Sequence, residues 1–326
     1  MKKTKVYFLL LVIIIVLIGL MGCNKEEAED IQINVASLKG PTSMGLVKVM
    51  EDDSNDQAKN DYNFTIAGLA DEVTTRIVSG EYDIAAIPAN LASVLYNKSE
   101  GKIEVVGINT LGVLYIVETG EQIQTVEDLK GKTIYSTGKG ITPEYTLNYL
   151  LSSNGVDPQK DLTIEYKSEA TEVAAILSES DDAIAMLPQP FVTTVMMNND
   201  KVRVALDVAE EWEKADKSGS AVTTGVVVVN RQFLEDNPSA VEVFLEEYNK
   251  SVSYVNSNVE EAAQLIEKFG IFKAAVAKKA IPECNIVLIT GEDMKTKLEG
   301  YLEVLYEQNP NSVGGKLPND DFYYIK

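Results

Sequence analysis

The hydrophobic and polar positions of this chain alternate in short blocks that have two different periods. From Ile31 to Val35 every second residue is apolar, which is the period of a β-strand. Met44, Val47 and Met50 then repeat at the spacing of a helix face, so we expect a helix that begins at Gly40 or Thr42. Further blocks predict strands at 31–38, 62–67, 83–87 and 103–108 and helices at 71–79 and from residue 90. Alternating strands and helices are typical of an open α/β sheet.

The same order returns after the chain passes Asn109. Strands are predicted at 111–118, 132–136, 162–166, 183–187 and 202–206, and helices at 142–153, 170–177 and 191–197. Residues 207–220 are interpreted as a charged insertion, and 223–229 as a strand that returns to the first lobe. The remainder is expected to be mostly helical, at 238–255, 260–269, 273–280 and 292–308. Two crossings, near Asn109 and Thr223, predict two lobes joined by a two-strand hinge.

Identical residues recur one hundred positions apart. The segment Lys39-Gly40-Pro41-Thr42 returns as Lys139-Gly140-Ile141-Thr142. Ala70, Glu72, Val73, Ile84, Ala85 and Pro88 also recur at this offset, as Ala170, Glu172, Val173, Ile184, Ala185 and Pro188. An ungapped register of this length is hard to maintain by chance, and internal similarity indicates repeated architecture. The fold is therefore predicted to be α/β, with two Rossmann-like lobes of the same build.

The N-terminus has the pattern of a secretion signal. Three lysines precede an apolar run from Val6 to Leu20, which ends in Leu20-Met21-Gly22-Cys23. This ending resembles the bacterial lipobox, in which the cysteine is acylated, so residues 1–22 are predicted to be a signal peptide and Cys23 the lipidated residue. A plain anchor helix with an incidental cysteine is the alternative, and both place the rest of the chain outside the cytoplasmic membrane. Residues 23–30 are expected to be a polar tether.

Composition narrows the chemistry of the protein. The formal net charge is -21, which disfavours binding to nucleic acid or to anionic lipid. Histidine is absent, which excludes Ser-His-Asp and Cys-His nucleophiles and imidazole-based zinc sites. Cys284 is the only other cysteine and is expected to be a buried apolar residue. We expect no enzymatic activity, no cofactor and no metal.

The candidate binding site lies where predicted strands lead directly into helices. In an open α/β sheet, ligands bind beyond the carboxyl ends of the strands, and helix N-termini offer free N–H groups to oxygen atoms. Lys39 and Lys139 are the only cations near these ends. Each turn is also an ordinary capping turn, and this alternative stays open for every one of them. The candidate ligand-binding residues are Lys39, Gly40, Pro41, Thr42, Ser43, Met44, Ala89, Asn90, Asn109, Thr137, Gly138, Lys139, Gly140, Thr142, Pro188, Gln189 and Thr224.

Aromatic residues near these turns are a second candidate feature. Tyr115, Tyr145, Phe191 and Trp212 are placed to stack on a flat ligand. Burial in the core is an equal expectation for Tyr145 and Phe191. Trp212, in the polar insertion, is interpreted as a rim residue, a lid or simple surface packing.

Several segments together resemble one protein family. They are Leu20–Cys23, Gly40–Gly45, Asp83–Ala89 and Val126–Lys132. With them the chain resembles the solute-binding lipoproteins of bacterial ABC importers, in the SsuA/THI5-like (NMT1-like) branch of the type II periplasmic-binding fold, which includes binders of sulfonates, nitrate and thiamine precursors. The resemblance implies a lobe of residues 31–109 plus 224–326 and a second lobe of residues 110–223, with a small organic molecule or anion bound between them.

The same resemblance implies partners and a location. The partners are ABC permease subunits and the membrane, which the protein would reach through an acyl chain such as palmitate on Cys23. The protein would be a monomer on the extracytoplasmic face of the cell membrane. Two alternatives stay open: a synthase-like or dehydratase-like enzyme on the same fold, and a sensory or adhesive lipoprotein. The lipobox argues against cytosolic synthesis, and the synthase needs a histidine. The scarcity of cations near the site favours a neutral or singly charged ligand.

Overall fold

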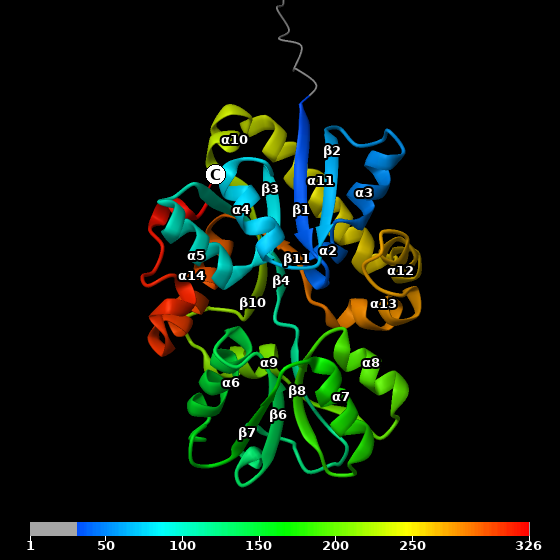
Figure 1. The fold of residues 1–326 in the computed structure, drawn as a ribbon, viewed down its shortest axis with the longest axis vertical. Helices are drawn as coiled ribbons and strands as arrows, with labels where there is room; N and C mark the ends of the chain where they lie inside the picture. The colour runs from blue at the N-terminus through cyan, green and yellow to red at the C-terminus, as the bar shows by residue number, and fades with distance from the viewer. Residues whose placement is uncertain (1–30, 326) are drawn as a thin grey trace, which may run out of the picture. The chain divides into compact units, whose positions relative to one another are not determined.

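The computed structural model describes residues 31–325 and has two β-sheets, each packed between helices (Figure 1). We call the six-stranded sheet with its helices lobe 1 and the five-stranded sheet with its helices lobe 2. The predicted signal peptide, tether and lipidated Cys23 lie outside the described residues. Among the helices that are described, none is both long and apolar enough to span a membrane.

The sheet of lobe 1 has the strand order β11-β4-β10-β3-β1-β2. Strand β1 pairs with β3 in parallel, whereas β10 is antiparallel to both β3 and β4. The centres of β3 and β10 are apolar and fully buried because both strands lie inside the sheet with helices on either face. The strands are β1 (Gln32–Leu38), β2 (Asp61–Ala67), β3 (Ile84–Pro88), β4 (Ile103–Leu111), β10 (Thr223–Asn230) and β11 (Ile286–Ile289).

The sheet of lobe 2 repeats this arrangement, with the strand order β7-β6-β8-β5-β9. It matches β2-β1-β3-β10-β4 strand for strand, and its one antiparallel strand, β5, occupies the place of β10. The antiparallel strand inside each sheet, β10 or β5, is thus formed by chain that arrives from the other lobe, which confirms the predicted duplication and the two-strand hinge. The strands are β5 (Leu114–Glu118), β6 (Thr133–Thr137), β7 (Thr163–Lys167), β8 (Ile184–Pro188) and β9 (Arg203–Asp207).

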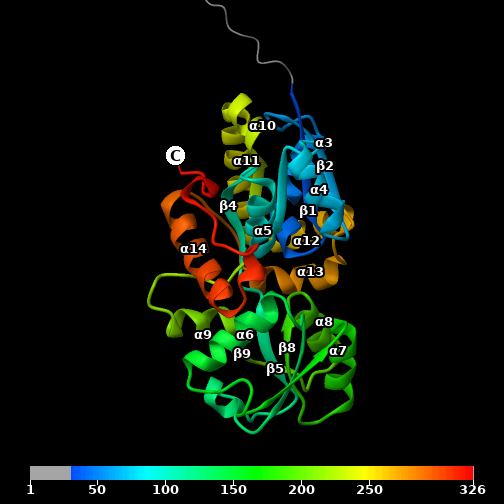
Figure 2. The same cartoon turned by 60° about the vertical axis from the view of Figure 1, so that its left-hand side comes forward.

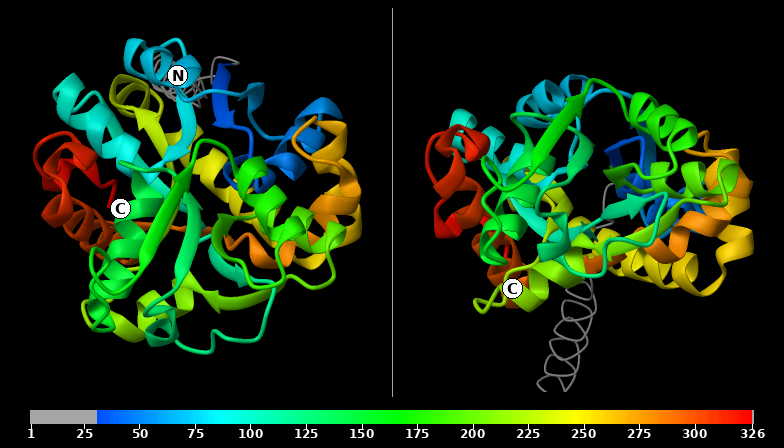
Figure 3. Two further views of the ribbon diagram at one scale, coloured as in Figure 1. Left: turned by 60° about the horizontal axis from the view of Figure 1, so that its bottom comes forward. Right: turned by 90° about the horizontal axis from the view of Figure 1, so that it is seen from below.

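Helices cover both faces of the sheet in lobe 1. One face packs against α3, α11, α12 and α13 around Phe244 and Tyr248, and the other against α4, α5 and α14 around Tyr96 and Tyr301. Figure 3 shows α12 and α13 (yellow to orange) on one side of the lobe and α14 (orange-red) on the other. The helices are α2 (Pro41–Met44), α3 (Val47–Ser54), α4 (Asp71–Ser79), α5 (Ala89–Ser99), α10 (Arg231–Asp236), α11 (Pro238–Ser257), α12 (Val259–Lys268), α13 (Ala274–Ala280) and α14 (Gly291–Gln308), with 3-10 turns η2 (Ile281–Glu283), η3 (Pro310–Val313) and η4 (Asp320–Phe322).

Lobe 2 is covered in the same way by fewer helices. The core on one face includes Leu147, Leu150 and Val208, and the core on the other includes Val173 and Val192. The first face is covered by η1 (Val126–Leu129), α6 (Thr142–Ser153) and α9 (Val208–Ala215), and the second by α7 (Ala170–Glu179) and α8 (Phe191–Asn198).

The helix predicted from Gly40 or Thr42 through Met50 is in fact two helices, α2 and α3, separated at Gly45. A Cβ atom at Gly45 would lie 3.0 Å from the Tyr248 ring, so α11 packs directly against this turn. The Ser251 hydroxyl of α11 also donates to the Gly45 carbonyl at 2.6 Å. Contact with a helix two hundred residues away therefore decides the break.

Residues 207–220 are interpreted from the sequence as a charged insertion, and the roles expected there for Trp212, a rim residue, a lid or surface packing, are wrong. Residues 208–215 form α9, which Asp207 caps by accepting from the Ala209 N–H at 2.8 Å. Trp212 is fully buried, its indole N–H donates to Ser220 Oγ at 3.0 Å, and its ring lies 4.1 Å from Tyr149 and 5.5 Å from Tyr301 between centroids. The mostly helical region at the C-terminus also contains strand β11, which the sequence pattern did not predict.

Candidate functional site

The carboxyl ends of the parallel strands in lobe 2 are directed toward lobe 1. Helix α6 follows β6 and contacts α14, and helix α8 follows β8 and contacts α13. Figure 2 shows α14 beside α6 and α9, and Figure 1 shows β1 of lobe 1 pointing toward lobe 2. The strand ends that the sequence singles out thus lie on the sides of the two lobes that face each other, where an open α/β sheet binds its ligands.

In lobe 1, the turn after β1 is held by hydrogen bonds between its own hydroxyl side chains and its own backbone. The Gly40 N–H donates to Ser43 Oγ at 3.3 Å, and that hydroxyl donates to the Gly40 carbonyl at 2.9 Å. Thr42 Oγ1 donates to the Leu38 carbonyl at 3.0 Å. Thr42 and Ser43 are both buried, whereas Lys39 is exposed. The two hydroxyls therefore act as local caps in this structure.

Asn109 holds this turn in place from strand β4. Its side chain is fully buried, and its amide Nδ2 donates to the Thr42 carbonyl at 3.0 Å and to the Tyr248 hydroxyl at 3.1 Å. Gly225 of β10 lies against the same pair: a Cβ atom there would be 2.5 Å from Thr42 Cγ2 and 2.6 Å from Asn109 Oδ1. Four segments of lobe 1 thus meet at one polar amide, and glycine is the residue that fits beside it.

The other candidate residues of lobe 1 mostly contact the chain itself. Met44 and Ala89 are buried in the core, and Asn90 Nδ2 donates to the Ser312 carbonyl at 3.3 Å. Pro41 and Thr224 are half-buried. The hydroxyl of Thr224 makes no hydrogen bond within the described part of the chain, so it is free to meet a ligand.

In lobe 2, the turn after β6 is built differently. Gly138 and Gly140 adopt φ angles of +76° and +78°, which L side chains rarely tolerate. The Gly140 N–H donates to the Glu144 carboxylate, and the Gly140 carbonyl accepts from the Tyr145 hydroxyl at 2.9 Å. Asn309 of lobe 1 donates to the same hydroxyl at 2.7 Å. This turn is therefore fixed from both lobes.

Of the remaining polar candidates of lobe 2, one side chain accepts hydrogen bonds from the chain itself and others make none with the residues that the structure describes. Gln189 is buried, and its Oε1 accepts from the backbone N–H of Thr193 at 3.2 Å and from its hydroxyl at 2.8 Å. Thr137 and Thr142 are half-buried, and within residues 31–325 their hydroxyls make no hydrogen bond. Lys139 is exposed, and its Nζ lies 6.0 Å from the centre of the Tyr166 ring. Pro188, at the end of β8, is half-buried.

Three of the four aromatic candidates are engaged in contacts within the chain. Tyr115, which is 2% exposed, donates from its hydroxyl to the Glu283 carbonyl of lobe 1 at 2.8 Å. Tyr145 and Trp212 are buried in the contacts described above, whereas Phe191 is 38% exposed at the start of α8. Burial raises the pKa of the Tyr115 hydroxyl, so this link between the lobes stays protonated at neutral pH.

Glu144 and Tyr166 are features of the site that the sequence patterns did not single out. Glu144 looked like an ordinary acidic residue in the first turn of a helix. The Tyr166 hydroxyl is buried without a hydrogen-bond partner, close to the Glu144 carboxylate but outside hydrogen-bond geometry. Burial first, and the Glu144 charge second, raise the pKa of Tyr166. No sequence signal places a residue of β7 beside this turn.

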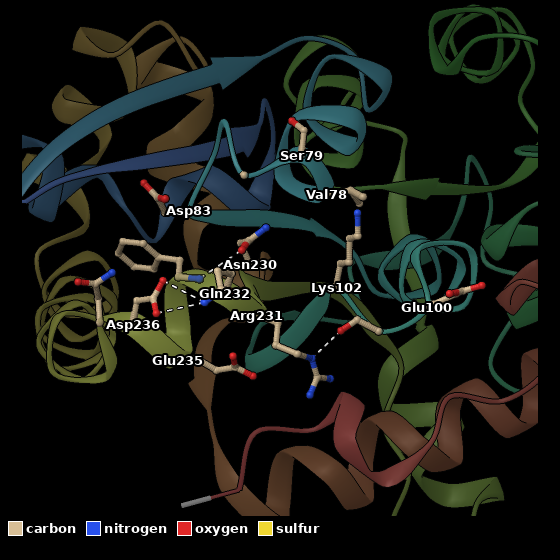
Figure 4. A pocket seen from close by; sticks show the side chains of 14 residues that line it. Val78, Ser79, Asp83, Glu100, Lys102, Asn230, Arg231, Gln232, Glu235 and Asp236 are labelled. Carbon is tan, nitrogen blue, oxygen red and sulfur yellow. Dashed lines mark hydrogen bonds between the residues drawn. The ribbon is translucent and has the colours of Figure 1, made fainter.

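A pocket of about 560 Å³ lies at the opposite end of lobe 1, near the amino ends of β3 and β4 (Figure 4). Some of its polar side chains have partners within the protein. Arg231 pairs with Glu104 at 3.0 Å and with Asp321 at 3.2 Å, two residues outside the pocket lining, and Gln232 donates to Asp236 at 3.0 Å. The pocket lies away from the carboxyl ends of the strands, where an open α/β sheet binds its ligands.

Comparisons with known proteins agree on one family and one fold. The family model described as NMT1/THI5 like matches residues 69–262. The crystal structure of an ABC transporter from Parabacteroides distasonis is similar with a TM-score of 0.74 and 24% identity, over 90% of this chain and 99% of that one. The periplasmic aliphatic sulphonate-binding protein SsuA from Escherichia coli is similar with a TM-score of 0.69 and 16% identity, over 90% and 92%.

A third similar structure is the alkanesulfonate-binding protein SsuA from Xanthomonas axonopodis pv. citri bound to MOPS. Its TM-score is 0.60 at 14% identity, over 88% of this chain and 94% of that one. Among curated proteins, none matches this chain significantly by sequence. These likenesses confirm the two-lobed α/β architecture.

Proposed function

We propose that this chain, which belongs to the NMT1/THI5-like family, is the solute-binding component of an ABC importer and captures a small molecule between its two lobes. The family match over residues 69–262 is the observation that carries the proposal. The duplicated lobes support it, because their strand ends face each other. The two SsuA structures, one described as binding aliphatic sulphonates and one bound to MOPS, have the same fold.

The proposed ligand contacts lie on the turns that follow the strands of both lobes. Lobe 1 would contribute the turn at 39–44 with residues 89, 90, 109 and 224, and lobe 2 the segments 137–142 and 188–189. Among these, Thr137, Thr142 and Thr224 have hydroxyls with no hydrogen bond in the described chain, so they are the first candidates to bind the ligand. A ligand that touches both lobes binds the closed arrangement better than the open one, and so shifts the protein toward closure.

The hinge is proposed to lie at the two crossings, after β4 ends at Leu111 and before β10 begins at Thr223. These positions are within two residues of the boundaries that the sequence suggested, 109/110 and 223/224. Trp212 packs against Tyr149 of lobe 2 and Tyr301 of lobe 1 close to these crossings. Because it is the only tryptophan in the chain, its fluorescence reports on the contact between the lobes.

We also propose that Cys23 carries an acyl chain such as palmitate after removal of residues 1–22, so that the protein works as a lipid-anchored monomer on the extracytoplasmic face of the membrane. The Leu20–Cys23 motif supports this proposal. Metabolic labelling with an alkyne fatty acid should label the wild type and not Cys23→Ser. Equal labelling of both would refute acylation at this residue, and light scattering of the purified protein would test the monomer.

A ligand screen on the detergent-solubilised full chain tests the function. Sulfonates, pyrimidines, vitamin precursors and nitrogen oxyanions would be compared by thermal shift. A ligand at one hundred times its Kd stabilises the folded state by about 2.7 kcal/mol, which is readily measured. A true ligand should also reduce the radius of gyration in X-ray scattering and change the fluorescence of Trp212. Tight binding without either change would contradict closure of the lobes.

Paired threonine variants separate the proposed site from general stability. Thr142 begins α6 after the carboxyl end of β6, whereas Thr163 begins the neighbouring strand β7 and lies at the amino ends of these parallel strands. Thr142→Val should weaken binding of any ligand found by about tenfold, because a buried polar ligand group loses its hydrogen bond. Thr163→Val should leave the affinity unchanged. Equal effects of the two substitutions would place the ligand elsewhere.

A further inference from the structure

Carboxylates of the chain itself occupy backbone donors at several strand ends that face the space between the lobes. Glu144 accepts from the Gly140 N–H after β6, and Glu172 accepts from the Glu169 N–H at 3.1 Å after β7. In lobe 1, Glu72 accepts from the Gly68 N–H at 3.1 Å after β2. N–H groups at helix starts are the donors that an anionic ligand uses. At each of these three turns a negatively charged side chain already occupies a backbone donor.

Glu144 is the one of these three carboxylates whose turn is linked by hydrogen bonds to the other lobe. Its backbone partner, Gly140, is held on the carbonyl side by Tyr145, which in turn accepts from Asn309 of lobe 1. Glu144 itself is half-buried, and no lysine or arginine in the described chain forms an ion pair with it. Lys139 is the nearest cation in sequence, but its Nζ lies over the Tyr166 ring. The carboxylate therefore keeps its charge at the point where both lobes meet.

An unused hydrogen-bond donor lies beside this carboxylate. The Tyr166 hydroxyl is buried and has no hydrogen-bond partner among the described residues, although Tyr166 as a whole is only half-buried. A buried hydroxyl without a partner costs free energy that a ligand can recover. Glu144 offers acceptor oxygens and Tyr166 offers a donor. The pair is complementary to a ligand group that has an N–H donor next to an acceptor, as an amide or a sulfonamide has.

We propose that Glu144 determines the specificity of this site, so that it selects neutral or protonated molecules with N–H groups and rejects sulfonates and other anions. The inference rests on the proposed solute-binding function and concerns only the charge and donor pattern of the ligand. An anion near Gly140 must displace Glu144 or lie against it, and like charges placed together disfavour the wrong partner. An N–H ligand meets no such repulsion.

Matched pairs of compounds test this inference because they keep shape and change only charge and donors. The pairs are benzenesulfonamide with benzenesulfonate, butane-1-sulfonamide with butane-1-sulfonate, and nicotinamide with nicotinate. Binding of each to the solubilised full chain would be measured by thermal shift and by Trp212 fluorescence. In the pairs that bind, the neutral member should bind at least about tenfold more tightly than the anion, as expected for a site that donates and accepts specific hydrogen bonds.

Two variants show whether Glu144 causes the preference. Glu144→Gln keeps the size of the side chain and removes its charge, so the ratio of the two affinities should fall at least about tenfold. Asp128→Asn is the matched control, because Asp128 also accepts a backbone N–H, that of Thr125 at 2.9 Å, but precedes the amino end of β6. It should leave the ratio unchanged.

The outcomes separate this inference from the function on which it rests. Tighter binding of the anions by the wild type, or an unchanged ratio in Glu144→Gln, overturns the role of Glu144 and leaves solute binding intact. If no compound of either class, nor any in the wider ligand screen, shifts the melting temperature or the fluorescence, solute binding fails and this inference fails with it.

Discussion

Replacing Asn109 with leucine tests how the candidate turn of lobe 1 is held. Leucine has the same branching and the same number of side-chain heavy atoms, so the substitution leaves no cavity and removes chiefly the two hydrogen bonds that Nδ2 donates, at 3.0 Å to the Thr42 carbonyl and at 3.1 Å to the Tyr248 hydroxyl. Both acceptors are in buried residues, so neither gains water in exchange. An unsatisfied buried polar group costs roughly 1–3 kcal/mol. We therefore expect Asn109→Leu to lower the free energy of unfolding by about 2–5 kcal/mol.

Equilibrium unfolding in guanidinium chloride, followed by Trp212 fluorescence and circular dichroism, measures this change through the midpoint at constant slope. Asn63→Leu is the control, because Asn63 is exposed and its amide donates only to Asn34 Oδ1 at 3.1 Å. It should change stability by less than about 0.5 kcal/mol. A loss below about 1 kcal/mol in Asn109→Leu would show that the buried amide does not hold the turn.

Three further substitutions test other parts of the structure. Trp212→Ala should lower the free energy of unfolding in denaturant by about 3–5 kcal/mol, because the ring is fully buried between aromatic residues of both lobes. A loss below about 1 kcal/mol would contradict that burial. Arg203→Met should lower the free energy of unfolding by about 3 kcal/mol in the same measurement, because it removes the cation that pairs with Glu118. The Glu118 side chain is only 1% exposed, so its carboxylate would be left buried without a partner cation. An unchanged midpoint would refute this reasoning. Burial raises the pKa of Asp207 above its ordinary value of 3.8, although the N–H groups it accepts oppose the shift. The folded state therefore binds the proton of the Asp207 carboxyl group more tightly than the unfolded state does. The stabilisation that this protonated group contributes is fully present below pH 3.8 and is lost as the pH rises through the folded pKa. Asp207→Asn keeps a good helix cap and does not titrate at this position. The stability of this variant relative to the wild type should therefore increase from about pH 3.5 to pH 7. A difference in stability that does not vary with pH would contradict the raised pKa.

The sequence by itself determined the repeated architecture and the position of most elements. Alternation of apolar residues marked β1, and unbroken apolar runs marked β3 and β8, because the side-chain period of a strand and burial on both faces leave a direct trace in the order of residues. The offset of one hundred residues by itself indicates two lobes of the same build. These features depend only on the order of residues within short segments and on composition, so they can be read from the sequence.

The tertiary structure alone decided how the two copies differ. Val35 pairs with Ile84 in lobe 1, whereas Ile134 pairs with Ile184 in lobe 2, so the connection from β6 to β8 is one residue longer than the connection from β1 to β3. The turn after β6 contains two left-handed glycines and its Gly140 N–H donates to Glu144, while the turn after β1 closes on Ser43.

Long-range packing likewise placed Trp212 and Asn109. The pattern of charges around Trp212 indicated a surface segment, but α9 turns its apolar side toward Tyr301, which is far away in the chain. Asn109 is buried and donates hydrogen bonds because the fold brings it next to Thr42, which precedes it in the sequence, and Tyr248, which follows it. Contacts of this kind depend on which elements meet in space, and the period of a single segment contains no information about its partners.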